Sequence, residues 1–186
     1  RFNFPQGIAV NTAGTTLYIA DTSNHAIRVI DLAASPVNVT TLAGAAGTAG
    51  STDNATGSSA RFNFPLGISL AGANLWVADS SNHSIRKVVA ATGAVTTQAG
   101  PDGSVGNVAG TSGNINSATP ASARFTNPTS VAADNTNLYV ADKGNHLIRV
   151  VSIATGAVTT LAGTGASGSA DGTGVLAAFN GPGGVA

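Results

Sequence analysis

The sequence predicts an all-β fold made of repeated four-stranded units, and three observations support this prediction. An eight-residue frame, Asp-x-x-Asn-His-x-Ile-Arg, occurs at residues 21–28, 79–86 and 142–149. The opening stretch RFNFPQGIAV returns as RFNFPLGISL, as RFTNPTSVAA and, more weakly, as AFNGPGGVA. Each unit also holds four short runs of branched and aromatic residues, punctuated by Gly, Asn, Asp, Ser or Pro. No window has a helical period, so we expect almost no helix.

The four strands of each unit are expected in a fixed order. The first follows a Phe-x-x-Pro turn and falls at residues 7–10, 67–70 and 129–132, with a further copy at 183–186. The second has Tyr or Trp in its second place and falls at 17–20, 75–78 and 138–141. The third falls at 25–30, 83–89 and 146–151, and the fourth at 37–43, 95–99 and 158–162.

Several of these strands, such as LYIA and LWVA, are apolar on both faces. A strand that is buried on both faces needs a neighbour on each side. Four-stranded sheets stacked face to face around an axis provide those neighbours, and regular repetition of such a unit is typical of a β-propeller. A two-sheet sandwich is the alternative. We place blade 1 at residues 1–60, blade 2 at 61–123, blade 3 at 124–178 and the first strand of a further blade at 179–186.

Composition narrows the range of partners. The formal net charge is zero, with 8 basic and 8 acidic side chains, which argues against nucleic acid or an anionic membrane as the main partner. The absence of cysteine excludes a disulfide framework, a thiolate metal site and a catalytic cysteine. No apolar run approaches the roughly 18 residues of a membrane span. The chain has no signal peptide, and because it begins and ends inside a repeat we interpret it as a piece of a longer precursor.

The repeated frame predicts an ion pair across a β-hairpin. Asp21 ends the second strand and Arg28 lies within the third, so their side chains meet across the hairpin, where a guanidinium can grip a carboxylate. Asn24 suits the turn because it tolerates left-handed geometry, and His25 is expected to open the third strand and offer a ring nitrogen to the backbone. The equivalent residues are Asp79, Asn82, His83, Arg86, Asp142, Asn145, His146 and Arg149.

Two catalytic or metal-binding interpretations of the same residues are weaker. The three histidines are a suitable number for zinc, but equivalent positions on different blades are held apart by the symmetry of the array. No serine recurs as a nucleophile with a supporting base. We therefore interpret the frame as structural, with no catalytic and no metal-binding residues.

The connections at residues 45–60, 101–123 and 164–178 are long and rich in Gly, Ala, Ser and Thr. Loops of this length are usually functional or disordered, so they are candidate interaction surfaces, with low-complexity connectors as the alternative. The carboxylates of these loops could ligate calcium, which takes hard oxygen ligands, but a calcium loop usually clusters several carboxylates and each of these loops has one, so a turn or loop-anchoring role is favoured. The candidate interaction residues are Asp53, Asp102, Asn107, Asn114 and Asp171.

The core Asn-His-x-Ile-Arg, preceded by Leu-Tyr-Val-Ala-Asp and Phe-x-x-Pro-x-Gly-Ile and followed by Val-Thr-Thr-Leu-Ala-Gly, resembles the NHL repeat family. The resemblance covers essentially the whole chain and implies a six-bladed β-propeller, of which three blades are half a ring, or a segment of a larger propeller. Some members bind RNA or protein through the propeller faces, and the related peptidyl-amidating lyases hold a metal on the axis. The scarcity of lysine here speaks against the basic face that RNA-binding members use.

Three blades leave two faces of buried-type side chains open, and such faces favour association. We therefore expect the chain to associate with other copies of itself, as a closed ring or a filament, or with further blades of a parent chain. The expected assembly edge consists of Phe2, Phe4, Phe179 and Val185.

The leading functional hypothesis is a non-catalytic scaffold for protein–protein interaction or self-assembly, extracellular or at the cell surface, without a cofactor. One alternative is a propeller enzyme of the lyase or hydrolase type, with an axial metal held partly by blades outside this segment. The first strands disfavour it, because they carry Ile8, Val10, Ile68, Leu70 and Val131 rather than ligand-type side chains. A second alternative is glycan or small-ligand binding by the long loops.

Overall fold

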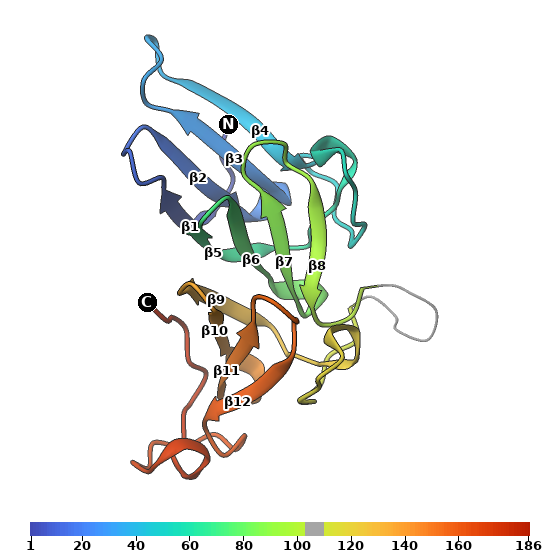
Figure 1. Ribbon diagram of the computed structural model, residues 1–186, viewed down its shortest axis with the longest axis vertical. Helices are drawn as coiled ribbons and strands as arrows, with labels where there is room; N and C mark the ends of the chain where they lie inside the picture. The colour runs from blue at the N-terminus through green and yellow to red at the C-terminus, as the bar shows by residue number, and fades with distance from the viewer. Residues whose placement is uncertain (103–109) are drawn as a thin grey trace.

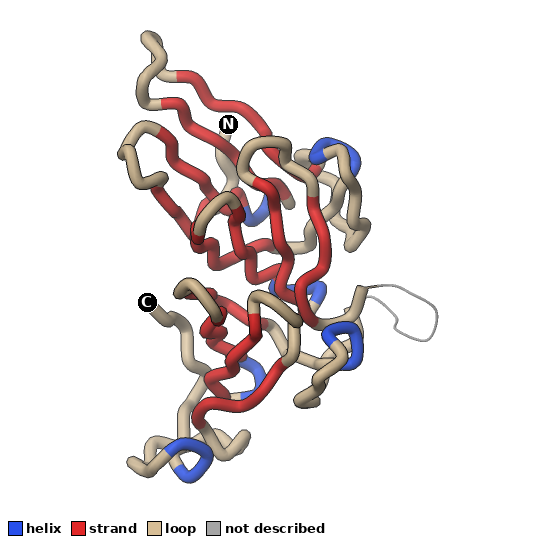
Figure 2. The backbone as a smooth tube through the Cα atoms, viewed as in Figure 1, coloured by secondary structure: helices blue, strands red, loops and turns tan. Residues whose placement is uncertain are grey.

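The computed structural model describes residues 1–102 and 110–186, and its architecture is three four-stranded antiparallel sheets packed one behind the next (Figure 1). Each sheet contains four consecutive strands in sequence order, so each repeat unit is one blade. Figure 2 shows that the strands dominate and that helix is confined to short turns. Among the described residues these are six three-residue 3-10 turns, and none is long or apolar enough to cross a membrane.

The strands of the three blades have closely matched bounds. Blade 1 contains β1 (Pro5–Val10), β2 (Thr16–Asp21), β3 (Ala26–Asp31) and β4 (Asn38–Gly44). Blade 2 contains β5 (Pro65–Ala71), β6 (Asn74–Asp79), β7 (Ser84–Val89) and β8 (Val95–Ala99). Blade 3 contains β9 (Pro128–Ala133), β10 (Asn137–Asp142), β11 (Leu147–Ser152) and β12 (Val158–Ala162).

The 3-10 turns recur at two places in each unit. One set follows the second strand: η1 (Thr22–Asn24), η3 (Ser80–Asn82) and η5 (Lys143–Asn145). The other set lies in the long connection that leads to the next unit: η2 (Gly57–Ser59), η4 (Pro120–Ser122) and η6 (Gly174–Leu176). The long connections therefore carry a conserved local shape within this chain, although their sequences differ.

One expected strand is absent. Residues 183–186 run along blade 3 without joining a ladder, although the sequence predicts a first strand there. Their only described hydrogen bonds within this stretch link Val185 to the Ser130 hydroxyl, as donor and as acceptor. A strand is defined by its ladder, and this segment has no second strand of its own unit beside it.

The core consists of two apolar layers, one between each pair of adjacent blades. Within a blade, alternate residues point to opposite faces, so Leu75 and Val77 pack towards blade 1 while Trp76 and Ala78 pack towards blade 3. The prediction that the second strand is buried on both faces is confirmed for blade 2. We call the face that packs on the preceding blade the front face and the opposite one the back face. The front face of blade 2 consists of Ile68, Leu75, Val77, Val88 and Val95.

The first strands of adjacent blades approach closely, and glycine makes this possible. A Cβ atom on Gly67 would lie 2.6 Å from the Cα atom of Ser130 and 2.8 Å from the carbonyl oxygen of Thr129. Both neighbours are backbone atoms, so relief would require the strands to separate.

Gly67→Ala is accordingly expected to destabilise the protein by about 1–3 kcal/mol, because overpacking a tight contact forces backbone shifts. Gly183→Ala is the matched control, since a Cβ there meets nothing within 4 Å. Urea unfolding followed by circular dichroism measures both variants. Equal midpoints for the two would contradict the close approach of β5 and β9.

Candidate functional site

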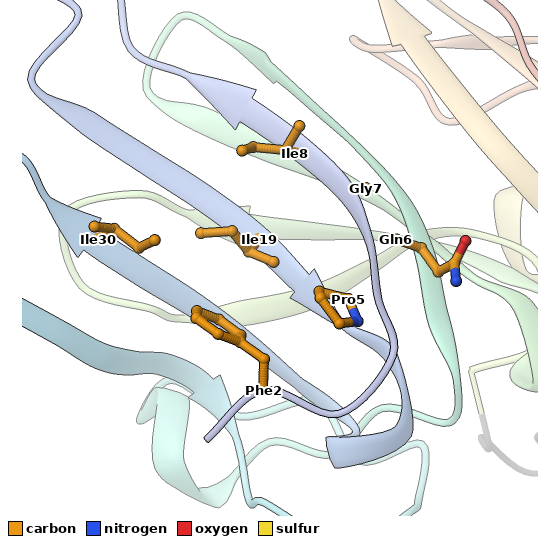
Figure 3. Close-up of a pocket in the computed structure, with 7 residues that line it drawn as sticks. All are labelled: Phe2, Pro5, Gln6, Gly7, Ile8, Ile19 and Ile30. Carbon is orange, nitrogen blue, oxygen red and sulfur yellow. The ribbon is translucent and has the colours of Figure 1, made fainter.

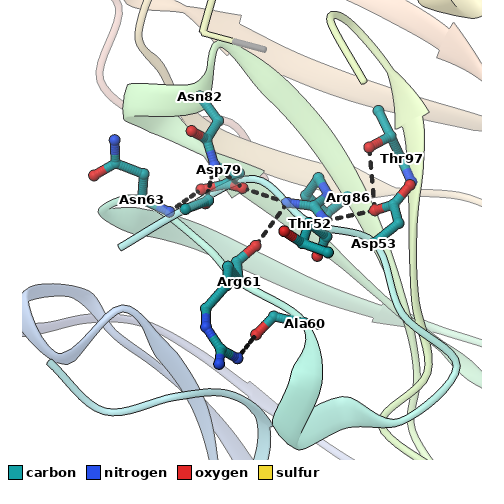
Figure 4. Close-up of polar contacts among 10 residues, drawn as sticks. Thr52, Asp53, Ala60, Arg61, Asn63, Asp79, Asn82, Arg86 and Thr97 are labelled. Atoms are coloured by element: carbon teal, nitrogen blue, oxygen red, sulfur yellow. Dashed lines mark hydrogen bonds and ion pairs between the residues drawn. The ribbon is translucent and has the colours of Figure 1, made fainter. Parts of the chain in front are cut away.

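The repeated frame forms a buried polar cluster at the end of each blade. In blade 2 the Oδ2 atom of Asp79 accepts hydrogen bonds from Nη1 of Arg86 at 2.7 Å and from Nδ2 of Asn82 at 2.8 Å (Figure 4). Its Oδ1 atom accepts the backbone N–H of Asn63 at 2.7 Å. Both charged side chains are almost wholly buried. The carboxylate is therefore fully occupied by protein donors.

Arg86 links this hairpin to the segment that enters the blade. Its Nη1 atom also donates to the carbonyl of Arg61 at 3.0 Å, and its Nη2 atom donates to the carbonyl of Thr52 and to the Asp53 carboxylate. The guanidinium carbon lies 5.2 Å from the centre of the Phe62 ring, within cation–π range. One side chain thus holds three separate stretches of chain together.

Blade 3 repeats this arrangement with one substitution. Arg149 donates to Asp142 at 2.8 Å and lies 5.2 Å from the Phe125 ring centre. Its Nη2 atom donates to the side-chain oxygen of Asn116 at 2.7 Å, in the place where blade 2 has a carboxylate. Asn145 donates to Asp142 at 2.8 Å, as its counterpart does in blade 2.

Burial perturbs these groups. Removal from water raises the pKa of the Asp79 and Asp142 carboxyls, against the lowering effects of their arginines and hydrogen bonds. The same loss of solvent lowers the pKa of the Arg149 guanidinium, while Asp142 opposes this. Each charge depends on its partner, and loss of either one would leave the other buried without compensation.

The histidines connect one unit to the next. The Nδ1 atom of His25 accepts the backbone N–H of Phe64 at 3.2 Å, that of His83 accepts Asn127 at 3.0 Å, and that of His146 accepts Gly181 at 3.0 Å. The prediction that histidine opens the third strand is wrong, because each one lies just before it. The left-handed residue of the turn is also the histidine rather than the asparagine, with φ of 53°, 55° and 56°.

The left-handed backbone of the histidine has a physical reason. The histidine is the residue that closes the 3-10 turn, and from there its ring reaches the following unit. Asn24 instead donates hydrogen bonds from its side-chain amide to the Asp21 carboxylate and to the carbonyl of Arg1. In the described part of the chain, no three His, Asp or Glu side chains gather as a metal site.

The predicted interaction residues are scattered. Asp53 is not a free loop residue, because its carboxylate binds Arg86 together with the backbone N–H and hydroxyl of Thr97. Asp102 is partly buried after β8, whereas Asn114 and Asp171 are exposed. Asn107 lies outside the described residues.

The sequence predicts an open apolar face at each end of the array, but of the residues that form the one on blade 1 it names only Phe2 as an edge residue. Phe2, Pro5, Ile8, Ile19 and Ile30 line a shallow hollow there (Figure 3). By strand register this is the front face of blade 1, and it consists of Ile8, Leu17, Ile19, Ile30 and Val39. Aligning the sequence of blade 1 with the buried positions of the other blades would have identified the residues of this face.

Exposure distinguishes blade 1 from the others. Ile8 is 61% exposed, whereas its counterparts Ile68 and Val131 are 7% and 4% exposed. Phe2 is 40% exposed, whereas Phe62 and Phe125 are fully buried. Among the other predicted edge residues, Phe4 is exposed while Phe179 and Val185 are partly buried against blade 3. The predicted edge therefore divides between the two ends of the blade array.

Three stacked four-stranded blades joined by repeated polar clusters define a β-propeller array. Residues 2–30 and 125–151 match the family described as NHL repeat, and the chain belongs to this family. It is 31% identical, over a 247-residue alignment, to Protein SUPPRESSOR OF QUENCHING 1, chloroplastic, of Arabidopsis thaliana, covering 100% of this chain and 23% of that protein. It is 38% identical over 91 residues to NHL repeat-containing protein 2 of Homo sapiens, covering 46% of this chain and 12% of that protein.

The fold has a counterpart among solved structures. A crystal structure of a protein of unknown function from Bacteroides thetaiotaomicron aligns with a TM-score of 0.72 at 20% identity. The alignment covers 97% of this chain and 41% of that chain. The chain thus spans less than a quarter of the curated relatives described above and under half of this structural neighbour.

The buried ion pair gives a stability prediction. Asp79→Ala is expected to cost on the order of 3–5 kcal/mol, because it leaves Arg86 buried with reduced compensation. Asp31→Ala is the control, since Asp31 is exposed and accepts one backbone N–H, so it should cost less than about 1 kcal/mol. Denaturant unfolding of both variants measures the difference. A cost below about 1 kcal/mol for Asp79→Ala would mean that the pair contributes little.

The hydrogen bond from Asn127 to His83 gives a pH prediction. Burial lowers the pKa of His83 from its usual 6.5, so the unfolded chain takes up the proton first. The stabilising contribution is therefore complete above about pH 6.5 and is lost as pH falls through the lower folded value.

His83→Asn should lose less stability between about pH 7.5 and about pH 5 than the wild type does, because asparagine tolerates left-handed geometry and does not titrate. Urea midpoints at the two pH values provide the comparison. An identical pH dependence in both proteins would contradict this assignment of the His83 ring.

Proposed function

We propose that this chain is a non-catalytic NHL propeller scaffold that self-assembles through its open blade faces. The observation that carries the proposal is the apolar front face of blade 1, where Ile8, Val39 and the adjoining Phe2 are exposed although the corresponding residues are buried in the other two blades. A second copy is the occupant we propose, because it brings the type of surface that covers a front face within this chain, namely the back face of a blade.

The energetic argument follows from burial. Fully burying a large aliphatic or aromatic side chain contributes about 1.5–3 kcal/mol. The front face of blade 1 has several side chains of this kind, and Phe2 and Ile8 are the most accessible of those that line the hollow. Covering them would give association a substantial driving force, of which part is spent on lost rigid-body freedom.

The polar residues of the repeats support a structural role. The recurring aspartates and arginines bind each other, and the recurring histidines accept backbone N–H groups from the next unit. The proposed scaffold therefore uses them as fasteners and needs no cofactor. The neutral, weakly charged composition is the reason for placing it outside the cell or at the cell surface.

Sedimentation velocity over a range of protein concentrations tests the proposal. The wild type is expected to sediment as a multiple of the 18.0 kDa chain, and Ile8→Asp is expected to shift the population towards single chains. Leu32→Asp is the matched control, because Leu32 is an exposed leucine in the loop between β3 and β4, outside the front face. A wild type that stays a single chain at every concentration would overturn self-assembly.

A further inference from the structure

The arginine of blade 1 has an incomplete set of partners. In blades 2 and 3 the Nη2 atom of the arginine donates to a side-chain oxygen of the incoming segment, which belongs to Asp53 or to Asn116. Arg28 bonds Asp21 through Nη1 and the carbonyl of Thr40 through Nε. Within residues 1–102 and 110–186, no hydrogen bond from its Nη2 atom is present, and the side chain is 14% exposed.

A threonine beside this arginine also lacks the side-chain acceptor that its counterparts in blades 2 and 3 have. Asp53 accepts from the backbone N–H and the hydroxyl of Thr97, and the corresponding hydroxyl of Thr160 donates to Asn116. In blade 1 this position belongs to Thr41, which pairs with Arg28 in the strand register as Thr97 pairs with Arg86. Thr41 is exposed. Blade 1 therefore presents a guanidinium and a threonine arranged to receive a carboxylate.

The other end of the chain carries a carboxylate in the equivalent place. The carbonyl of Thr52 accepts the N–H of Arg61, and Asp53 is the next residue. The carbonyl of Ala170 accepts the N–H of Ala178 in the same way, and the next residue is Asp171. Asp171 is exposed, and its carboxylate has no partner in the part of the chain that the structure describes.

We infer that Asp171 of one copy completes the Arg28 site of a second copy. The contact is head-to-tail: the back face of blade 3 covers the front face of blade 1, and the carboxylate reaches Arg28 and Thr41. This inference rests on the proposed self-assembly and specifies its geometry. Since the two surfaces differ, the contact is heterologous, and it builds either a ring or a filament.

The contact also assigns a role to the last nine residues. Residues 178–186 lie on blade 3 in the place that residues 1–9 of the next copy would take, because each stretch starts a unit. Arg61 and Arg124 begin this stretch in the other units, and each donates to one carbonyl of the preceding 3-10 turn and to the carbonyl of the residue directly before it. Ala178 lacks this side chain, whereas Arg1 has it. Residues 1–9 of the second copy therefore displace residues 178–186.

Cross-linking can test the contact directly, because the chain has no cysteine. Thr40→Cys and Ala170→Cys, each next to a residue of the proposed contact, are made as separate proteins, mixed, and treated with a short bis-maleimide, so that Arg28, Thr41 and Asp171 stay intact. A covalent two-chain product is expected from the mixture and not from either protein alone. Asp31→Cys mixed with Ala170→Cys is the control, since Asp31 is also exposed in blade 1 but lies at the end of β3, three residues beyond Arg28.

Association constants give a second readout. Asp171→Lys should weaken association at least about tenfold, whereas Asp31→Lys should not, and a chain ending at Ala177 should associate more tightly than the wild type. Asp171 has no partner among the described residues, so its replacement is expected to leave the fold of the single chain unchanged.

The outcomes separate the two proposals. A wild type that associates, with no cross-link and no effect of Asp171→Lys, overturns the head-to-tail contact and leaves self-assembly standing. A wild type that never exceeds one chain in mass overturns both. Two peptides are also added as competitors in the cross-linking reaction: one with the sequence of residues 164–177 and one with the same composition in scrambled order. Equal inhibition by both would indicate that the Arg28 site accepts a carboxylate in any sequence context, and would contradict a specific second copy.

Discussion

The buried aspartate–arginine pair is the interaction on which the blades depend. A carboxylate removed from water needs donors at every oxygen, and here the donors come from three places: the turn, the facing strand and the backbone of the incoming segment. A guanidinium with several N–H groups can satisfy such a site and still hold further carbonyls. The pair therefore fixes the hairpin and the entry of the chain into the blade at the same time.

The three blades pack against each other through the same pair of faces at each interface. Each blade has a front face of branched aliphatic side chains and a back face that combines an aromatic residue, Tyr18 or Trp76, with alanines such as Ala20 and Ala78, and the two kinds of face pack against each other. Stability in such an array is close to a sum over units and the interfaces between neighbours. The histidine bonds between units add a polar contact to each apolar interface. The front face of blade 1 presents side chains of the same kind with no blade packed on it in this structure.

Much of this architecture follows from the sequence, because the repeated motifs show where each unit begins and each strand is recognised from a few neighbouring residues. The blade count, the strand order and the hairpin partners of Asp79 all depend on residues close together in the chain. The role of Asp53 could not be predicted in this way, since its partner Arg86 lies 33 residues away. Nothing in the neighbouring sequence distinguishes a loop aspartate that binds within the protein from one that faces solvent. The left-handed histidine was missed because asparagine is the residue that usually takes that geometry.

One position in each unit meets the histidine of the preceding unit, and its residue type changes along the chain. The residue whose N–H meets the histidine ring has a left-handed backbone in all three places, and it is Phe64, then Asn127, then Gly181. A left-handed phenylalanine costs roughly 1–2 kcal/mol of backbone energy that glycine avoids. In exchange its ring packs edge-on against His25, with centres 4.8 Å apart. The first contact between units thus combines a strained backbone with an aromatic contact, whereas glycine takes the same conformation at the last one without that strain and without a ring.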